Sequence, residues 1–383
     1  MLEVVKSDFR SSAIPVISVI GIGGGGCNAV DRMIEAGMKN VSFIAMNTDY
    51  QVLEDCHATE KLQIGKKLTS GLGAGGDPAI GEASAEESAE EIAAAVRDSK
   101  MVILTCGLGG GTGTGAIPVV ARICREQKIL TVGVVTLPFT FEGQSKQEMA
   151  QKGLEALREH TDMHLVIPND KLLNITEKNF YLDDAFTMAD SVLKYTIEGI
   201  TGIIFGKGTI NLDFNDLKTT ITNTGLGHLG IGTIKKDDSI MDAVKQAINS
   251  PLLETDISSA SKILINTSGR INLIELNEAV SYLKEITRPD VRILWGTVSY
   301  QNADEDIVVT VIATGLDDRK KDDVATDIGN TLDLIFCHDK INSNTTSSYR
   351  DKTNISDNDT DKMATELKIP MFIYKHSKQK NIK

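Results

Sequence analysis

Short apolar runs alternate with amphipathic stretches from residue 15 onward. The runs are VISVIGIG (16–23), VSFIAMN (41–47), MVILTCG (101–107), TVGVVTL (131–137) and HLVIPN (164–169). They show little polar alternation, which is typical of strands buried on both faces. The stretch NAVDRMIEAG (28–37) has a helical period, with Gly37 as a candidate C-cap. This order predicts an α/β fold with a doubly wound parallel sheet, whose ligands bind at the carboxyl ends of the strands.

A long apolar-periodic stretch over 183–205 predicts one central helix, and a second, smaller α/β region follows it. Its expected strands lie at 230–234, 262–269, 291–300 and 307–315, and its expected helices at 239–249 and 272–285. We therefore expect six parts: a short N-terminal extension (1–13), a nucleotide-binding domain (14–182), the central helix (183–208), a second domain (209–317), a disordered linker (318–364) and a C-terminal segment (365–383).

The composition changes abruptly near residue 317. Residues 317–364 are rich in Asp, Asn, Ser, Thr and Lys, which is typical of a flexible linker. TELKIPMFIYK (365–375) then restores apolar residues and is followed by a basic end. From composition alone this segment is equally consistent with a docking peptide and with a frayed tail.

Charge and cysteine content exclude several classes of protein. The net charge of −13 over 383 residues argues against a nucleic-acid partner. The five cysteines are widely spread and form no C-x-x-C pair, so neither a disulfide framework nor a zinc site is indicated. We expect no signal peptide, and no apolar run approaches the roughly 18 residues that span a bilayer. We interpret the protein as cytoplasmic.

The first glycine cluster, GIGGGGCNAV (21–30), follows a predicted strand and opens a helix. It satisfies G-x-G-x-x-G at Gly21, Gly23 and Gly26, and Asp49 lies about where a dinucleotide-binding acid would stand. Taken alone, this cluster indicates a nicotinamide-dependent oxidoreductase.

The second cluster, GLGGGTGTGA (107–116), also follows a strand and opens a helix, whose first turn we expect to contain Pro118. Glycines bring consecutive N–H groups to bear on one anion, and Thr112 and Thr114 can add hydroxyl donors. Two such loops in one sheet indicate a ligand with several phosphates. No G-x-x-x-x-G-K-[ST] is present, so a Walker loop is excluded.

With GGGTGTG and no Walker lysine, residues 14–317 resemble the tubulin/FtsZ family of GTPases. The resemblance implies GTP and GDP as ligands, with Mg²⁺ held through the phosphates and no direct protein ligand. It also implies a chain that polymerises head to tail and forms the division ring at mid-cell. The implied nucleotide-binding residues are Gly24, Gly25, Asn28, Asn47, Ala74, Gly75, Gly76, Gly110, Gly111, Thr112, Gly113, Thr114, Glu142, Lys146, Phe186 and Asp190.

The resemblance also suggests individual roles. Glu142 would reach the ribose, Phe186 would pack on the base, and Asp190 would accept the guanine N–H groups. Lys146 stands where the family usually has an arginine. Lysine keeps the positive charge but lacks the bidentate fork of the guanidinium group. Asp77 stands where an asparagine is common, which adds a negative charge near the phosphates.

INLDFNDLKT (210–219) matches the family's N-x-D-x-x-D loop at Asn211, Asp213 and Asp216, the implied hydrolytic group. On its own this spacing is also a common helix-capping pattern. A central helix about 33 Å long would separate these carboxylates from their own subunit's phosphates. They are then expected to act on the nucleotide of the next subunit in a filament.

The tail LKIPMFIYK resembles the family peptide that docks on membrane tethers. Ile369, Pro370 and Phe372 are kept, whereas Lys368 replaces an acidic residue. Two alternatives stay open beside the GTPase: the nicotinamide oxidoreductase, and a non-catalytic scaffold that binds nucleotide and assembles without turnover.

Overall fold

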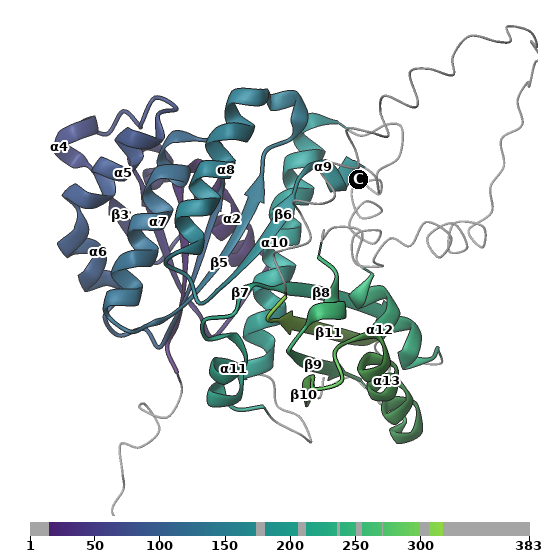
Figure 1. Cartoon of the computed structure of the whole chain (residues 1–383). Helices are drawn as coiled ribbons and strands as arrows, with labels where there is room; N and C mark the ends of the chain where they lie inside the picture. The colour runs from purple at the N-terminus through teal and green to yellow at the C-terminus, as the bar shows by residue number, and fades with distance from the viewer. Residues whose placement is uncertain are drawn as a thin grey trace, which may run out of the picture.

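The computed structural model describes residues 15–173, 181–205, 212–235, 238–249, 255–269, 271–298 and 306–316. These residues form two sheets joined by one long helix (Figure 1). The predicted N-terminal extension, linker and C-terminal segment lie outside the described residues. So do Asn211, Ile369, Pro370 and Phe372.

The first sheet has seven strands, in the order β3-β2-β1-β4-β5-β6-β7. They are β1 (Ile17–Ile22), β2 (Ser42–Asn47), β3 (Glu60–Gln63), β4 (Met101–Gly107), β5 (Leu130–Leu137), β6 (Met163–Pro168) and β7 (Gly225–Leu226). Every pairing is parallel. The predicted doubly wound parallel sheet is thus confirmed.

Helices cover both faces of this sheet (Figure 1). The helices that precede α10 (Leu182–Phe205) along the chain are α2 (Gly23–Glu35), α3 (Tyr50–Asp55), α4 (Lys66–Thr69), α5 (Pro78–Glu87), α6 (Ala89–Val96), α7 (Gly111–Glu126), α8 (Gln144–Arg158) and α9 (Asp170–Leu173). Successive residues of a strand pack into different hydrophobic clusters, one on each face of the sheet. Val19 packs in the cluster that contains α2 residues, and Ile20 packs in the cluster that contains residues of α5 to α8. This two-sided burial explains why the strands read as continuous apolar runs.

The central helix is α10 (Leu182–Phe205), close to the predicted bounds. Ile197 and Ile200 share one buried cluster with Leu264 and Ile312 of the second sheet, so the apolar core continues from one domain into the other. Gly199 permits this approach, because a Cβ there would lie 3.3 Å from Thr310 Cγ2.

The second sheet is mixed, with the order β10-β9-β11-β8. Its strands are β8 (His228–Ile234), β9 (Lys262–Ser268), β10 (Arg292–Val298) and β11 (Ile307–Thr314). Strand β11 runs antiparallel to both β8 and β9, whereas β9 and β10 are parallel. The remaining helices are α11 (Phe214–Ile221), α12 (Ile240–Ile248) and α13 (Leu273–Ile286), with short 3₁₀ turns η1 (Thr140–Glu142) and η2 (Ile257–Ser259). The predicted second α/β domain is confirmed.

Helix ends show one confirmed prediction and one error. Gly37 takes φ 74°, and its N–H and that of Met38 bond back to Ile34 and Met33, which closes α2 as a Schellman motif. The expectation for Pro118 is wrong, because α7 begins at Gly111 and Pro118 lies inside the helix. The glycine loop itself supplies the first helical turn, so the proline lies about two turns beyond its usual place at the first helical position.

In the part of the chain that the structure describes, no helix has both the length and the apolar character of a membrane span.

Candidate functional site

Both glycine loops lie where the strand order of the first sheet reverses. Strands β1 and β4 are neighbours, and the chain continues from β1 toward β2 and β3 but from β4 toward β5 and β6. The first loop follows β1 directly and the second follows β4. Ligands of open α/β sheets bind in the crevice at such a point, outside the carboxyl ends of the strands.

Four loops converge at this crevice. A Cβ on Gly23 would lie 2.8 Å from Gly113 N, so the two glycine loops touch through their backbones. A Cβ on Gly111 would lie 2.8 Å from Asp77 N, which brings in the loop over 71–77. The Thr112 hydroxyl lies 2.7 Å from that of Thr48, which follows β2. The segments that the sequence assigned to one ligand are therefore adjacent.

The first turns of α2 and α7 are suited to bind an anion. Among the described residues, no side chain caps either helix, whose N-cap positions are Ile22 and Gly110. Gly24, Gly25 and Asn28 form the exposed face at the start of α2, while their neighbours in this helix are buried. Open N–H groups at two adjacent helix starts, each with a partial positive charge, are the donors that phosphates require.

The two threonines of the second loop differ in their surroundings. Thr114 is 3% exposed, and its hydroxyl accepts a hydrogen bond from Gly109 N at 2.8 Å. It therefore holds the turn of its own loop. Thr112 is half-buried beside Thr48 at the crevice.

The loop after β2 is held by its own polar side chains. Asn47 is buried; its Oδ1 accepts from Asp49 N at 3.2 Å, and its Nδ2 donates to Cys27 Sγ at 3.9 Å. Asp49 caps α3 by accepting from Gln51 N and Val52 N. The acid expected to bind a dinucleotide ribose is thus engaged in a helix cap, which weakens the oxidoreductase interpretation.

The loop over 71–77 has an unusual backbone. Gly75 and Gly76 have φ of 60° and 81° and are exposed, and Ala74 is buried beneath them. Asp77 ends the loop as the N-cap of α5, where its carboxylate accepts from Ala79 N at 2.9 Å. Asp77, which stands where an asparagine is common in the family, therefore has a local structural role as a helix cap.

The segment after β5 reaches the second glycine loop, because a Cβ on Gly109 would lie 3.1 Å from the Lys146 carbonyl oxygen. Glu142 accepts from Phe139 N at 2.9 Å, and its other oxygen lies 3.1 Å from Lys146 Nζ. Phe186 of α10 packs edge-on against Phe139, with ring centroids 5.6 Å apart, and remains 39% exposed. An aromatic ring is therefore available beside the crevice for stacking.

Asp190 of α10 forms an ion pair with Arg32 of α2, with Nε to Oδ2 at 2.8 Å. Burial raises the pKa of Asp190 to about 6, against the opposing effect of Arg32. Asn169, which follows β6, is 5% exposed, and its Oδ1 has no hydrogen-bond partner among the described residues. Buried polar atoms are rarely left unpaired, so Asn169 is a further candidate for ligand binding that is not among the predicted nucleotide residues.

Asp213 and Asp216 lie elsewhere, at the start of α11. Asp213 accepts from Asp216 N at 2.8 Å, and Asp216 accepts from Asp213 N at 3.2 Å. This is a reciprocal capping box, the structural role that the spacing also allowed.

Helix α11 lies at the amino ends of the strands of the first sheet, whereas the glycine loops lie at the carboxyl ends. The residues that follow it, Asn223 and Thr224, bond to Asp162, which directly precedes β6. Figure 1 shows α11 beside the lower end of α10. The site residues Phe186 and Asp190 lie in the first half of α10, which at 24 residues is about 36 Å long. Within one chain, Asp213 and Asp216 therefore lie far from the glycine loops.

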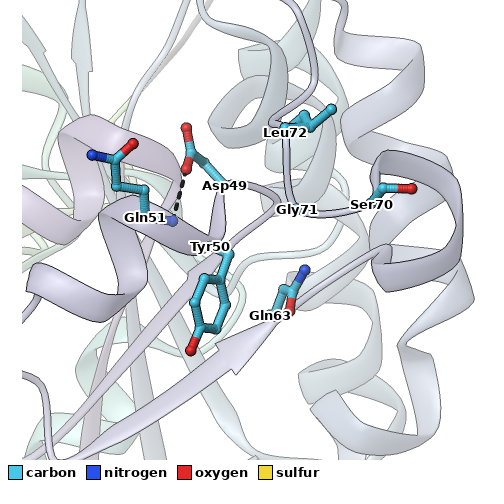
Figure 2. A pocket seen from close by; sticks show the side chains of 7 residues that line it. All are labelled: Asp49, Tyr50, Gln51, Gln63, Ser70, Gly71 and Leu72. Atoms are coloured by element: carbon cyan, nitrogen blue, oxygen red, sulfur yellow. Dashed lines mark hydrogen bonds between the residues drawn. The ribbon is translucent and has the colours of Figure 1, made fainter.

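A cavity of about 480 Å³ opens beside the loop over 71–77 (Figure 2). It is lined by Asp49, Tyr50, Gln51, Gln63, Ser70, Gly71 and Leu72. None of the predicted nucleotide residues lines it, so it is distinct from the crevice between β1 and β4. Leu72 on its rim is 85% exposed. Within the described ranges, no three His, Cys, Asp or Glu side chains are grouped as metal ligands.

The fold and the crevice define a nucleotide-binding protein with a second domain attached through a long helix. The family model described as "Tubulin/FtsZ family, GTPase domain" matches residues 16–177, and "FtsZ family, C-terminal domain" matches residues 225–317. The chain belongs to the tubulin/FtsZ family of GTPases.

Solved structures agree with this assignment. An empty FtsZ dimer from M. jannaschii is 44% identical, with a TM-score of 0.74 over 80% of this chain and 90% of that chain. A tryptophan-to-tyrosine mutant of FtsZ from M. jannaschii is also 44% identical, with a TM-score of 0.75 over 80% and 93%. CetZ2 from Haloferax volcanii, in a GTPγS-bound protofilament, is 19% identical with a TM-score of 0.69 over 85% and 100%, and shares the fold.

Proposed function

We propose that the chain binds GTP in the crevice between β1 and β4, assembles head to tail, and hydrolyses GTP only between subunits. Asp213 and Asp216, with Asn211 beside them in the sequence, complete the site of the neighbouring subunit. The observation that carries this proposal is the separation of the two parts along α10, about 36 Å for 24 residues. A site divided between opposite ends of one chain is completed by a second copy, and repetition of this contact gives an open filament.

Each part of the crevice has a proposed task. The uncapped first turns of α2 and α7 bind the phosphates through backbone N–H groups, and Mg²⁺ enters with the phosphates. Glu142 and Lys146 lie near the ribose, and Phe186 and Asp190 hold the guanine. Asp213 and Asp216 orient and polarise the water that attacks the γ-phosphorus, and GDP leaves. Phosphoryl transfer depends mainly on such positioning and charge.

Exposed apolar side chains support the head-to-tail contact. Leu72 lies in the loop next to the proposed phosphate site. Leu273 and Ile274, 77% and 71% exposed, begin α13 in the second domain. Large exposed apolar residues in separate domains suit a heterologous contact between copies. The similar M. jannaschii chain was solved as a dimer.

Replacing Leu273 with glutamate should raise the protein concentration needed for assembly by roughly tenfold or more, because a charge would be buried against an apolar surface. GTP affinity of the dilute protein should not change. Light scattering against protein concentration measures the concentration needed for assembly, and nucleotide titration measures the GTP affinity. Ser281→Glu, two turns along the same exposed face, is the matched control. Assembly of Leu273→Glu at the wild-type concentration would contradict this contact.

Guanine binding should weaken in acid. The carboxylate of Asp190 accepts guanine N–H groups only when ionised, and burial raises its pKa to about 6. Protonation as the pH falls through 6 removes the acceptor, so GDP affinity should fall roughly tenfold between pH 7 and pH 5. Asp190→Asn controls for the titration of the phosphates and should lack this component. Parallel pH profiles for the two proteins would contradict the role of Asp190.

One observation favours a second candidate, the non-catalytic scaffold. The reciprocal capping box gives Asp213 and Asp216 a structural purpose that needs no chemistry. Such a protein would bind GTP and assemble without turning it over.

In the cell we propose a cytoplasmic protein that forms the division ring at mid-cell beneath the membrane. Its C-terminal segment, through Ile369, Pro370 and Phe372, would dock on membrane-tethering and regulatory division proteins. These residues lie outside the described part of the chain.

Phosphate release per molecule, measured against protein concentration with Mg²⁺ and alongside light scattering, tests the proposal. A specific rate near zero in dilute protein that rises together with scattering supports a shared site. A rate per molecule that is constant at all dilutions confines catalysis to one chain and refutes it. Assembly without phosphate release identifies the scaffold.

A further inference from the structure

Cys27, within the first glycine cluster, and Cys56, at the end of α3, form a buried thiol pair. Cys27 lies in α2 between Gly26 and Asn28 and is 0% exposed. Cys56 ends α3 and is 3% exposed. Neither belongs to the proposed nucleotide residues, and both are free thiols.

Cys56 Sγ lies 3.2 Å from Asp31 Oδ1, and Asp31 follows Cys27 by one turn on the same face of α2, so the Cys56 sulfur lies against the part of α2 that carries Cys27. A hydrogen bond between the thiols is the largest influence on the pKa of both: together with burial it raises the pKa of Cys27, and it lowers that of Cys56. Burial and the neighbouring Asp31 oppose the lowering at Cys56. Cys56 is therefore the more readily ionised sulfur of the pair.

Polar neighbours fix each sulfur in place. Cys56 Sγ donates to Asp31 Oδ1 at 3.2 Å, and the same oxygen accepts from His57 N. The His57 ring also faces this carboxylate, with Nδ1 3.5 Å away. On the other side, Asn47 Nδ2 donates to Cys27 Sγ. Asn47 is one of the proposed nucleotide residues, so the pair is connected to the loop after β2 as well as to α2.

We propose that Cys27 and Cys56 form a reversible disulfide when the protein meets a peroxide, and that this bond weakens nucleotide binding at the adjacent loops. The first half stands on the thiol pair alone. The second half rests on the proposed GTP site.

The reaction balances with hydrogen peroxide as the oxidant. The Cys56 thiolate attacks one peroxide oxygen and breaks the O–O bond, which gives a sulfenic acid and hydroxide. The Cys27 sulfur then displaces the sulfenic hydroxyl to form the S–S bond, and its proton leaves with that hydroxyl as water. In total, two thiols and one peroxide become one disulfide and two waters. A dithiol reductant reverses the oxidation by thiol–disulfide exchange.

The bond would act on the site through geometry. A disulfide holds its sulfurs about 2.05 Å apart, much closer than two hydrogen-bonded sulfurs. Its formation draws the first turns of α2 toward α3 and removes the thiol that Asn47 contacts. Displaced N–H groups make weaker hydrogen bonds to the phosphates, so we expect GDP affinity to fall roughly tenfold or more.

The test treats the full chain with hydrogen peroxide, blocks the remaining thiols, and maps its peptides by mass spectrometry. We expect one linked pair that carries residues 27 and 56, lost on reduction. Cys56→Ser should abolish this link, whereas Cys124→Ser, which alters a buried cysteine of α7 outside the pair, should retain it. Sulfinic acid at Cys56, or a link to Cys337 instead, would overturn the proposal.

Affinity for a fluorescent GDP analogue is measured on the same samples. Weaker binding by oxidised wild-type protein, restored by reduction and absent in Cys56→Ser, supports the coupling. A complete 27–56 link with unchanged affinity overturns it. If the reduced protein binds no GDP at all, the proposed function fails, and the peptide map still decides whether the disulfide forms.

Discussion

Replacing Asp213 with asparagine is expected to lower GTP turnover by about 100-fold or more, because a positioned carboxylate that polarises water is typically worth that much. GTP affinity should stay unchanged, since α11 lies at the amino ends of the strands, opposite the glycine loops. Asparagine caps helices as well as aspartate does, so the bond to Asp216 N is kept and only the charge is lost. Phosphate release and nucleotide titration measure the two quantities.

A control separates catalysis from helix capping. Ser239 caps α12 by accepting from Met241 N. Ser239→Ala should cost about 1 kcal/mol of folding free energy and leave turnover intact. A parallel loss of GTP binding and turnover in Asp213→Asn would refute action on a neighbouring subunit.

Replacing Gly24 with valine should lower GTP affinity by roughly 100-fold or more while the protein remains folded. Outside its own helical turn, no atom of the described chain lies within 4 Å of a Cβ at Gly24, so the added branch meets open space. It would instead cover the exposed N–H groups at the start of α2. Two lost hydrogen bonds to a charged phosphate, at about 1.5–3 kcal/mol each, account for the expected factor.

The same substitution in α10 provides the control. Outside its own helical turn, Gly202 also has no atom of the described chain within 4 Å of an added Cβ. Gly202→Val should therefore leave both affinity and the melting temperature close to wild type. Unchanged affinity in Gly24→Val would show that the phosphates bind elsewhere.

The sequence predicted the elements whose burial is continuous. The nine strands that it predicted in the two domains all form, because each reads as an apolar run with a definite end. It missed β3 and β7, which are four and two residues long and lie at the edges of the first sheet. A strand such as EKLQ, exposed or half-buried throughout, leaves no apolar pattern to detect.

The candidate site was predictable where it is local and not where it depends on tertiary contacts. The glycine loops are contiguous motifs that follow predicted strands, so their common place at the carboxyl ends of one sheet was predictable, whereas the pairing of β1 with β4 came from the structure. The pairing of Asp190 with Arg32 joins residues of two distant helices, and no spacing signals it. Asn169 became a candidate only through burial without a partner among the described residues. The spacing of Asp213 and Asp216 is consistent with both a helix cap and a catalytic loop, and the structure contains the helix cap.

Mixing two defective proteins tests the shared site most directly. Gly24→Val should lose its own nucleotide but keep Asp213 and Asp216, whereas Asp213→Asn should keep the nucleotide and lose the catalytic charge. In an equal mixture, about one contact in four would join an intact crevice to an intact pair of carboxylates. The account predicts that GTP turnover, nearly absent in either protein alone, reappears on mixing. No recovery, although both proteins sediment in the same polymer, would contradict it.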